Sequence, residues 1–416
     1  MSSRRDFLKS ALGSSAVVAL GAAAPRFLVE AAERPSNANG ETVLVVVQLS
    51  GGNDGINTVV PYGDDIYYQN RFTLALDKNK VHKLDDYHAL HPSLGGFAKL
   101  VEVRRLAIVQ GVGYANPNRS HFESMDIWHT ARREPQGRSL GWLGRYLDAS
   151  AKQASAKQAG ANVHSDVPAL HLGGGQQPLA LAALDVHAPS IRSLDQFKLQ
   201  DGGDRRLREA IERLSATPRP GEDDLLSFVQ SSTAAALASS QRMQEALGKY
   251  APAATYPGTK LAQSLSTVAQ LIDAGLSTRI YYVSLDGFDT HSEQGDAHAS
   301  LLAELGDAVK ALVDDLAGHG HADRVLVMSF SEFGRRVREN ASRGTDHGAA
   351  APMFLAGGKV KPGLIGKHPS MADLDNGDLK HHTDFRAIYA AVLKNWLGWS
   401  AGEILGGEYE PADVLA

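Results

Sequence analysis

The chain contains no cysteine among its 416 residues. This absence excludes disulfides, thiolate metal sites and a cysteine nucleophile together. Any metal must therefore be held by histidine, aspartate or glutamate. The chain also lacks a basic excess, because 42 lysines and arginines stand against 47 aspartates and glutamates, for a formal charge of −5. Without that excess a nucleic-acid backbone is an unfavourable partner, and we expect no nucleic-acid binding.

The N-terminal segment has the pattern of an export signal. Two adjacent arginines, Arg4 and Arg5, precede an apolar run rich in alanine and glycine over residues 11–24. This pattern is typical of a secretory signal, and the arginine pair indicates the twin-arginine translocase. We therefore expect residues 1–32 to be a signal and linker, cleaved after Ala24 or Ala32. The mature protein is then periplasmic or secreted and has no stable membrane span.

The remaining chain has the periodicity of an α/β fold. Short apolar runs, typical of buried strands, occupy residues 42–49, 106–113, 277–285 and 324–330. Helical patterns with a three-to-four-residue apolar period cover residues 261–272 and 301–316. This alternation predicts a doubly wound, mostly parallel sheet in one domain over residues 41–416. The polar stretch at about 202–257 predicts a helical insertion in that domain.

Acidic residues follow three of these strands, and in parallel sheets ligands bind beyond the carboxyl ends of the strands. A single acid there is commonly a turn or cap residue. Several acids accompanied by histidines instead favour a metal centre holding one or two zinc, manganese, magnesium or calcium ions. The candidate ligands are Asp54, Asp289, His291, Glu332, Asp346 and His347.

Ser120 is the candidate nucleophile. It begins a predicted helix, whose positive end would favour a serine alkoxide and a bound anionic group. The alternative is a capping box, because Glu123 follows three residues later. Arg119 is placed to hold an oxyanion, although an exposed arginine is the simpler explanation.

Several of these motifs, taken together, resemble a large family of exported bacterial proteins of unknown function, related to the alkaline phosphatase and sulfatase superfamily. Besides the arginine pair, the resemblance rests on residues 48–55, 118–121, 287–291, 331–335 and 344–348. It implies an alkaline phosphatase-like α/β fold whose strand ends hold two metals around a Ser or Thr nucleophile.

By that resemblance Asp54 matches the first-strand metal acid, Ser120 the nucleophile, and Asp289 with His291 the acid-and-histidine cluster. Asp346 and His347 match either the late acid-histidine pair or the final histidine. The chain departs from the superfamily after the strand ending at Phe330, where Asp-His-Gly is replaced by Ser-Glu-Phe-Gly.

Two functions follow from these patterns. The first is an exported, metal-dependent hydrolase of phosphate or sulfate esters, acting on a small-molecule or glycan ester. The alternative is a non-catalytic envelope protein that keeps the fold to bind metal, a glycan or a protein partner.

Overall fold

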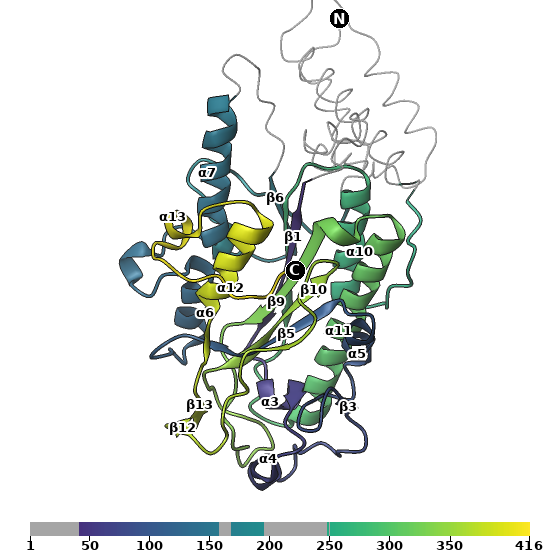
Figure 1. Cartoon of the computed structure of the whole chain (residues 1–416), viewed down its shortest axis with the longest axis vertical. Helices are drawn as coiled ribbons and strands as arrows, with labels where there is room; N and C mark the ends of the chain where they lie inside the picture. Colours follow the sequence, from purple (N-terminus) through teal and green to yellow (C-terminus); the bar gives the residue numbers. More distant parts are fainter. Residues whose placement is uncertain (1–40, 158–167, 195–247, 249) are drawn as a thin grey trace, which may run out of the picture. The chain divides into compact units, whose positions relative to one another are not determined.

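Figure 1 shows the computed structural model of the chain, which describes residues 41–157, 168–194, 248 and 250–416. The chain divides into two compact units, one of residues 1–35 and 194–250 and one of residues 36–193 and 251–416. Nearly all described residues belong to the second unit. The expected signal at 1–32, and the expected helical insertion up to residue 247, lie outside the described residues.

A nine-stranded sheet forms the centre of the second unit, in the order β11-β5-β10-β9-β1-β8-β6-β7 with β14 beside β5. The four expected strands are present as β1 (Val43–Ser50), β5 (Leu106–Gly113), β8 (Ile280–Asp286) and β9 (Val325–Ser331). The others are β6 (Ala169–Leu172), β7 (Ser190–Ile191), β10 (Ala351–Gly357), β11 (Gly363–Ile365) and β14 (Thr383–Asp384). Strand β1 pairs in parallel with β8 and β9, whereas β10 is antiparallel to β9 and β5. The prediction of a mostly parallel sheet is therefore confirmed, with one reversed strand.

Helices cover both faces of the sheet (Figure 1). On one side lie α5 (Gly95–Glu102), α10 (Lys260–Asp273) and α11 (Gln294–Gly318), which pack against one another. On the other lie α6 (His121–Thr130), α7 (Trp142–Lys157), α12 (Phe385–Ala391) and α13 (Ala401–Leu405). Because both faces are covered, every residue of β1 from Val43 to Leu49 except the amide-bearing Gln48 is apolar, and all are buried.

An aromatic layer joins the α6, α7 and α12 side to the sheet. The Trp128 ring stacks on Phe385 with centroids 4.3 Å apart, and Trp142 stacks on Tyr389 at 4.2 Å. Burying each of these rings stabilises the fold by roughly 1.5–3 kcal/mol. Helix α12 continues as a π-helical turn over Val392–Trp396.

Smaller elements lie around the carboxyl edge of the sheet. They are α3 (Gly55–Thr58), α4 (Asp65–Asn70), the antiparallel strands β2 (Val59–Val60), β3 (His82–Lys83) and β4 (Ala89–Leu90), and the hairpin of β12 (Leu374–Asp375) with β13 (Asp378–Leu379). Short 3-10 turns occupy Pro135–Gly137, Leu179–Leu181 and Ala322–Arg324. Among the described residues, no helix combines the length and apolar character needed to cross a membrane.

Candidate metal centre

The loops that follow β1, β8 and β9 meet at the carboxyl edge of the sheet. Gly51, which follows β1, has φ of 117°, and a Cβ on it would lie 2.3 Å from the backbone nitrogen of Asp289. Its own N–H donates to Glu332 Oε1 at 2.8 Å. Only glycine allows this approach, since any side chain would push the β8 loop away. The expected convergence of strand-end loops is therefore confirmed for the Asp289 and Glu332 loops.

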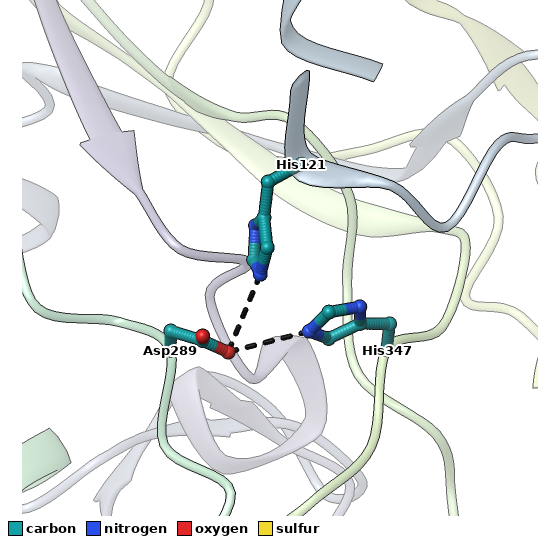
Figure 2. A group of neighbouring side chains, drawn as sticks. All are labelled: His121, Asp289 and His347. Atoms are coloured by element: carbon teal, nitrogen blue, oxygen red, sulfur yellow. Dashed lines mark hydrogen bonds and ion pairs between the residues drawn. The ribbon is translucent and has the colours of Figure 1, made fainter. Parts of the chain in front are cut away.

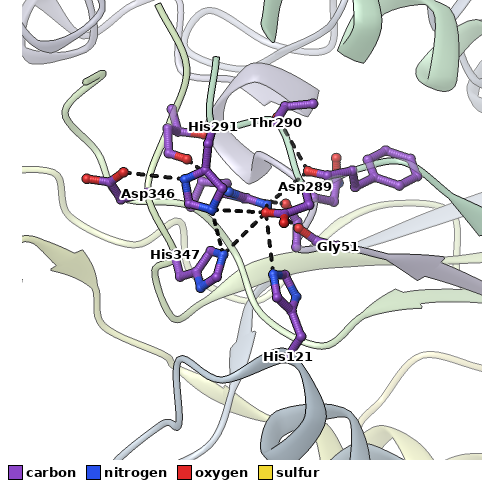
Figure 3. A network of polar contacts seen from close by, with 12 residues as sticks. Gly51, His121, Asp289, Thr290, His291, Asp346 and His347 are labelled. Atoms are coloured by element: carbon purple, nitrogen blue, oxygen red, sulfur yellow. Dashed lines mark hydrogen bonds and ion pairs between the residues drawn. The ribbon is translucent and has the colours of Figure 1, made fainter. Parts of the chain in front are cut away.

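Three imidazoles surround one oxygen of Asp289, and these four residues form what we call the histidine cluster (Figure 3). Figure 2 shows Asp289 with two of them, His121 and His347. The Nε2 atoms of His121, His291 and His347 lie 3.4, 3.0 and 3.3 Å from Asp289 Oδ1. The Nε2 atoms of His291 and His347 are 2.8 Å apart. His121 is the first residue of α6, Asp289 and His291 follow β8, and His347 precedes β10.

The other ring nitrogen of each histidine faces an acceptor. Nδ1 of His347 lies 2.8 Å from the backbone oxygen of Arg119, and Nδ1 of His121 lies 2.8 Å from Glu332 Oε1. A carbonyl oxygen only accepts, so Nδ1 of His347 carries a proton and its Nε2 presents a lone pair to the cluster. Such acceptors behind Nδ1 are typical of metal-binding histidines, because they fix the tautomer and the ring orientation.

Local charges set the protonation of the cluster. Burial alone would raise the pKa of Asp289, but the Arg335 guanidinium outweighs it and holds that pKa at about 2. The hydrogen bond to Glu332 raises the pKa of His121, while burial lowers the pKa of His347. At neutral pH the cluster therefore combines one carboxylate anion with imidazoles whose Nε2 atoms face it. The Nε2 lone pairs and the Asp289 carboxylate repel one another unless a cation or additional protons lie between them.

The donor set fits a divalent metal ion. Two ligands of a tetrahedral zinc ion lie about 3.3 Å apart, and the three distances to Asp289 Oδ1 are close to this value. Within the described part of the chain, the ligand atoms of His121, Asp289 and His347 all lie within 4.8 Å of one another. The Nε2 of His121 is buried and has no hydrogen-bond partner within that part of the chain. Imidazole nitrogen with carboxylate oxygen is a common ligand set for zinc and related ions.

Arg335 holds the loops of the cluster together. Its side chain is fully buried and donates to the backbone oxygens of Gly52 (2.7 Å), Thr345 (2.9 Å) and Phe288 (3.0 Å), as well as to that of Gly51. It also donates to Asp289 Oδ1 at 2.7 Å. One guanidinium thus fixes the segments after β1 and β8 and the segment before β10.

The structure distributes the six expected metal ligands over three positions. Asp289, His291 and His347 lie together in the histidine cluster. Glu332 and Asp346 lie behind imidazoles instead, the latter with Oδ1 3.5 Å from His291 Nδ1. Asp54 is buried outside the cluster, where its carboxylate binds Arg71 and Gln294.

Ser120 and Arg119 lie at the start of α6, beside the cluster. Ser120 is exposed and occupies the N-cap position, but its side chain makes no capping hydrogen bond, so the capping-box alternative is wrong. Glu123 instead pairs with Arg138. The Arg119 side chain is 40% exposed and donates to Asp378 Oδ2 from Nε at 2.8 Å.

Sequence reasoning missed His121 as a ligand, and it missed Arg335 and Arg71 as organising cations. His121 stands directly after the candidate nucleophile, at the head of the helix that follows β5, so its approach to the same sheet edge was a usable signal. No sequence spacing marks Arg71, which lies 17 residues from Asp54.

The fold and the histidine cluster define an α/β protein with a candidate metal centre at the carboxyl edge of its sheet. The chain belongs to the family described as "Protein of unknown function (DUF1501)", whose model matches residues 41–395. A search of curated proteins finds no match.

Several solved structures are similar to the chain at low sequence identity, among them the following three. The PsFucS1 sulfatase from Pseudoalteromonas sp. is 10% identical, with 92% of this chain and 71% of that chain covered and a TM-score of 0.38. The lipoteichoic acid synthase LtaP from Listeria monocytogenes is 9% identical, with coverage of 94% and 81% and a TM-score of 0.39. The C-terminal periplasmic domain of EcEptC from Escherichia coli, solved in complex with Zn, is 8% identical, with coverage of 78% and 75% and a TM-score of 0.33.

Proposed function

We propose that this protein is an exported, metal-dependent hydrolase of phosphate or sulfate esters. The observation that carries the proposal is the histidine cluster, in which three imidazole Nε2 atoms and a carboxylate oxygen face one point. The motif resemblance to the alkaline phosphatase and sulfatase superfamily supports the ester class. Export to the periplasm or beyond the cell rests on the arginine pair near the N-terminus.

His121, Asp289, His291 and His347 would hold the ion, with Glu332 and Asp346 as the acceptors behind two of the imidazoles. Because nitrogen donors outnumber oxygen, zinc suits the set better than manganese, magnesium or calcium. When bound, the ion would supply positive charge that offsets the charge developing on the transferred group.

Ser120 is the nucleophile in this proposal, and its position supports that role. It is exposed, adjoins His121 in the chain and stands at the N-terminus of α6. The unpaired N–H groups of that terminus attract the anionic group of a phosphate or sulfate ester. Arg119 uses two of its N–H groups on Asp378, and a guanidinium has five, so it keeps donors for the same anionic group.

The test is turnover of 4-nitrophenyl phosphate and 4-nitrophenyl sulfate by the full chain loaded with zinc or manganese. We expect Ser120→Ala to abolish turnover while leaving the metal content unchanged. Ser400→Ala is the matched control, because Ser400 is also an exposed N-cap residue without a capping hydrogen bond. Turnover that survives Ser120→Ala contradicts the proposed nucleophile. Bound metal without turnover of either ester supports the non-catalytic binding protein instead.

A further inference from the structure

Asp54 is an expected metal ligand that lies outside the histidine cluster, and both of its carboxylate oxygens are bound by other side chains. It follows β1, is 1% exposed, and lies beside the loop that carries Gly51. Arg71 donates to Oδ2 from Nη1 at 2.5 Å and to Oδ1 from Nη2 at 2.9 Å, and Gln294 donates to Oδ2 at 2.5 Å. Burial by itself would raise the pKa of Asp54, but the Arg71 guanidinium outweighs it and lowers that pKa. The negative charge on the two Asp54 oxygens is therefore already balanced by hydrogen-bond donors of the protein.

The cation that pairs with Asp54 is fixed in place. The Arg71 side chain is fully buried at the end of α4. Its Nε donates to the backbone oxygen of Val337 at 2.8 Å, and its Nη2 donates to that of Arg336 at 3.0 Å. A guanidinium does not lose its proton in a protein, and the Arg71 guanidinium could reach solvent only by breaking these hydrogen bonds. A second divalent ion on Asp54 would thus lie against a permanent, buried positive charge.

The histidine cluster shares with Asp54 a buried guanidinium bound to the carboxylate, and it differs in its exposure and in the imidazoles around that carboxylate. The Asp289 side chain is 48% exposed, and the buried Arg335 donates to Oδ1, the oxygen that the imidazoles face. Its remaining neighbours are imidazoles, which are neutral when they bind a metal. A divalent ion here would have three imidazole nitrogens and a half-exposed carboxylate around it, whereas at Asp54 both carboxylate oxygens are already bound by Arg71 and Gln294.

We infer that the centre holds a single divalent cation. The Arg71 guanidinium supplies at Asp54 the positive charge that a second metal ion would otherwise supply. This inference rests on the proposed metal centre and narrows it from one or two ions to one. Asp54 is then a positioning residue. Gln294 connects it to the ligand loops, because Gln294 Oε1 accepts from Thr290 (3.1 Å) and Thr345 (2.6 Å), the residues before His291 and Asp346.

The metal content of the full chain tests the inference. The protein is stripped with a chelator, dialysed against zinc or manganese with a weak competing chelator, and analysed by mass spectrometry and by electron paramagnetic resonance of the manganese form. We expect about one ion per chain and an uncoupled manganese spectrum. Two tightly bound ions, or a spin-coupled manganese pair, overturn the inference but leave the proposed function standing. No bound ion overturns the metal centre and, with it, the proposed function.

Variants at Asp54 and at the histidine cluster show which of these two positions binds the ion. Replacing both members of the buried pair, Asp54→Asn with Arg71→Met, avoids leaving one charge buried alone. We expect this double variant to keep about one ion per chain, with no more than a roughly tenfold loss of affinity from looser ligand loops. His121→Asn should lose the ion. If a cooperatively unfolding double variant also loses it, Asp54 is a ligand and the inference is wrong. If the double variant does not fold, the stoichiometry and spectrum of the unmodified chain decide.

Discussion

Replacement of Glu332 by glutamine tests whether this residue acts through His121 or binds metal itself. Glu332 is 2% exposed, and its Oε1 accepts from Nδ1 of His121 and from the N–H of Gly51. Its Oε2 accepts from Ser331 Oγ at 3.0 Å. A glutamine of the same shape can keep its oxygen toward His121 and turn its amide toward Ser331, whose hydroxyl accepts as well as donates. The substitution therefore removes charge while preserving packing.

The expected loss follows from the change of acceptor. A hydrogen bond to a charged group contributes about 1.5–3 kcal/mol, and one between neutral groups about 0.5–1.5 kcal/mol. The difference of about 1.4 kcal/mol weakens metal binding roughly tenfold, within the range found for groups behind metal ligands. A direct ligand converted to an amide would cost far more than this.

The measurement is competition for zinc between the protein and a chromophoric chelator, with thermal unfolding measured in parallel. Glu339→Gln is the matched control, because Glu339 is also a buried glutamate but accepts from the backbone of Thr73 and Leu74. The control should lose stability without losing zinc affinity. An affinity change below twofold in Glu332→Gln refutes the role of His121 as a ligand, and complete loss of zinc refutes the placement of Glu332 behind it.

Three further results are expected. Burial lowers the pKa of His129 to about 3 and of His298 to about 4, so the native state binds fewer protons than the unfolded state below pH 6.5. Urea unfolding with a chelator present should therefore show stability falling by about 1.4 kcal/mol per pH unit for each histidine as the pH drops from 6.5 toward 4, and constant stability contradicts this. Arg335→Lys should cost at least about 3 kcal/mol of unfolding free energy in urea, because a lysine cannot reach the acceptors that the guanidinium joins, and a loss below 1 kcal/mol argues against that role. Phe122, 85% exposed and next to His121, should stack on the ring of an aryl or glycan ester. Phe122→Ala should raise KM about three- to tenfold with kcat unchanged, and an unchanged KM refutes the stacking.

The strands that carry the site could be predicted because they are buried on both faces. Such strands are continuous apolar runs, and β1, β5, β8 and β9 all begin and end within three residues of the expected bounds. Strand β10 was not expected. Its sequence is equally apolar, but the local sequence does not indicate whether a strand runs parallel or antiparallel to its neighbours.

The site was predicted in part, for a related reason. Motif position indicates which loops meet, so the convergence of Asp289, His291 and His347 could be predicted. It does not indicate which atom of a side chain faces inward. Glu332 was therefore expected as a ligand, whereas its carboxylate faces Nδ1 of His121.

Asp54 illustrates a second limit. Its place after β1 resembles that of a metal acid, but its charge is set by Arg71, which arrives from the end of α4. An ion pair of this kind depends on how a loop folds back over the sheet, and the spacing of residues in the sequence does not predict that loop conformation.

The chain positions of the four cluster residues determine when the centre can form during folding. They stand at 121, 289, 291 and 347, on loops that meet only after β5, β8, β9 and β10 have taken their places in one sheet. Contacts between segments so distant in sequence form slowly, because long loops must close first. A chain in which β8 is unpaired separates Asp289 and His291 from His121 and His347, and two donors are too few to hold an ion tightly. Metal uptake by the proposed centre is therefore expected late in folding, after β8 has joined the sheet.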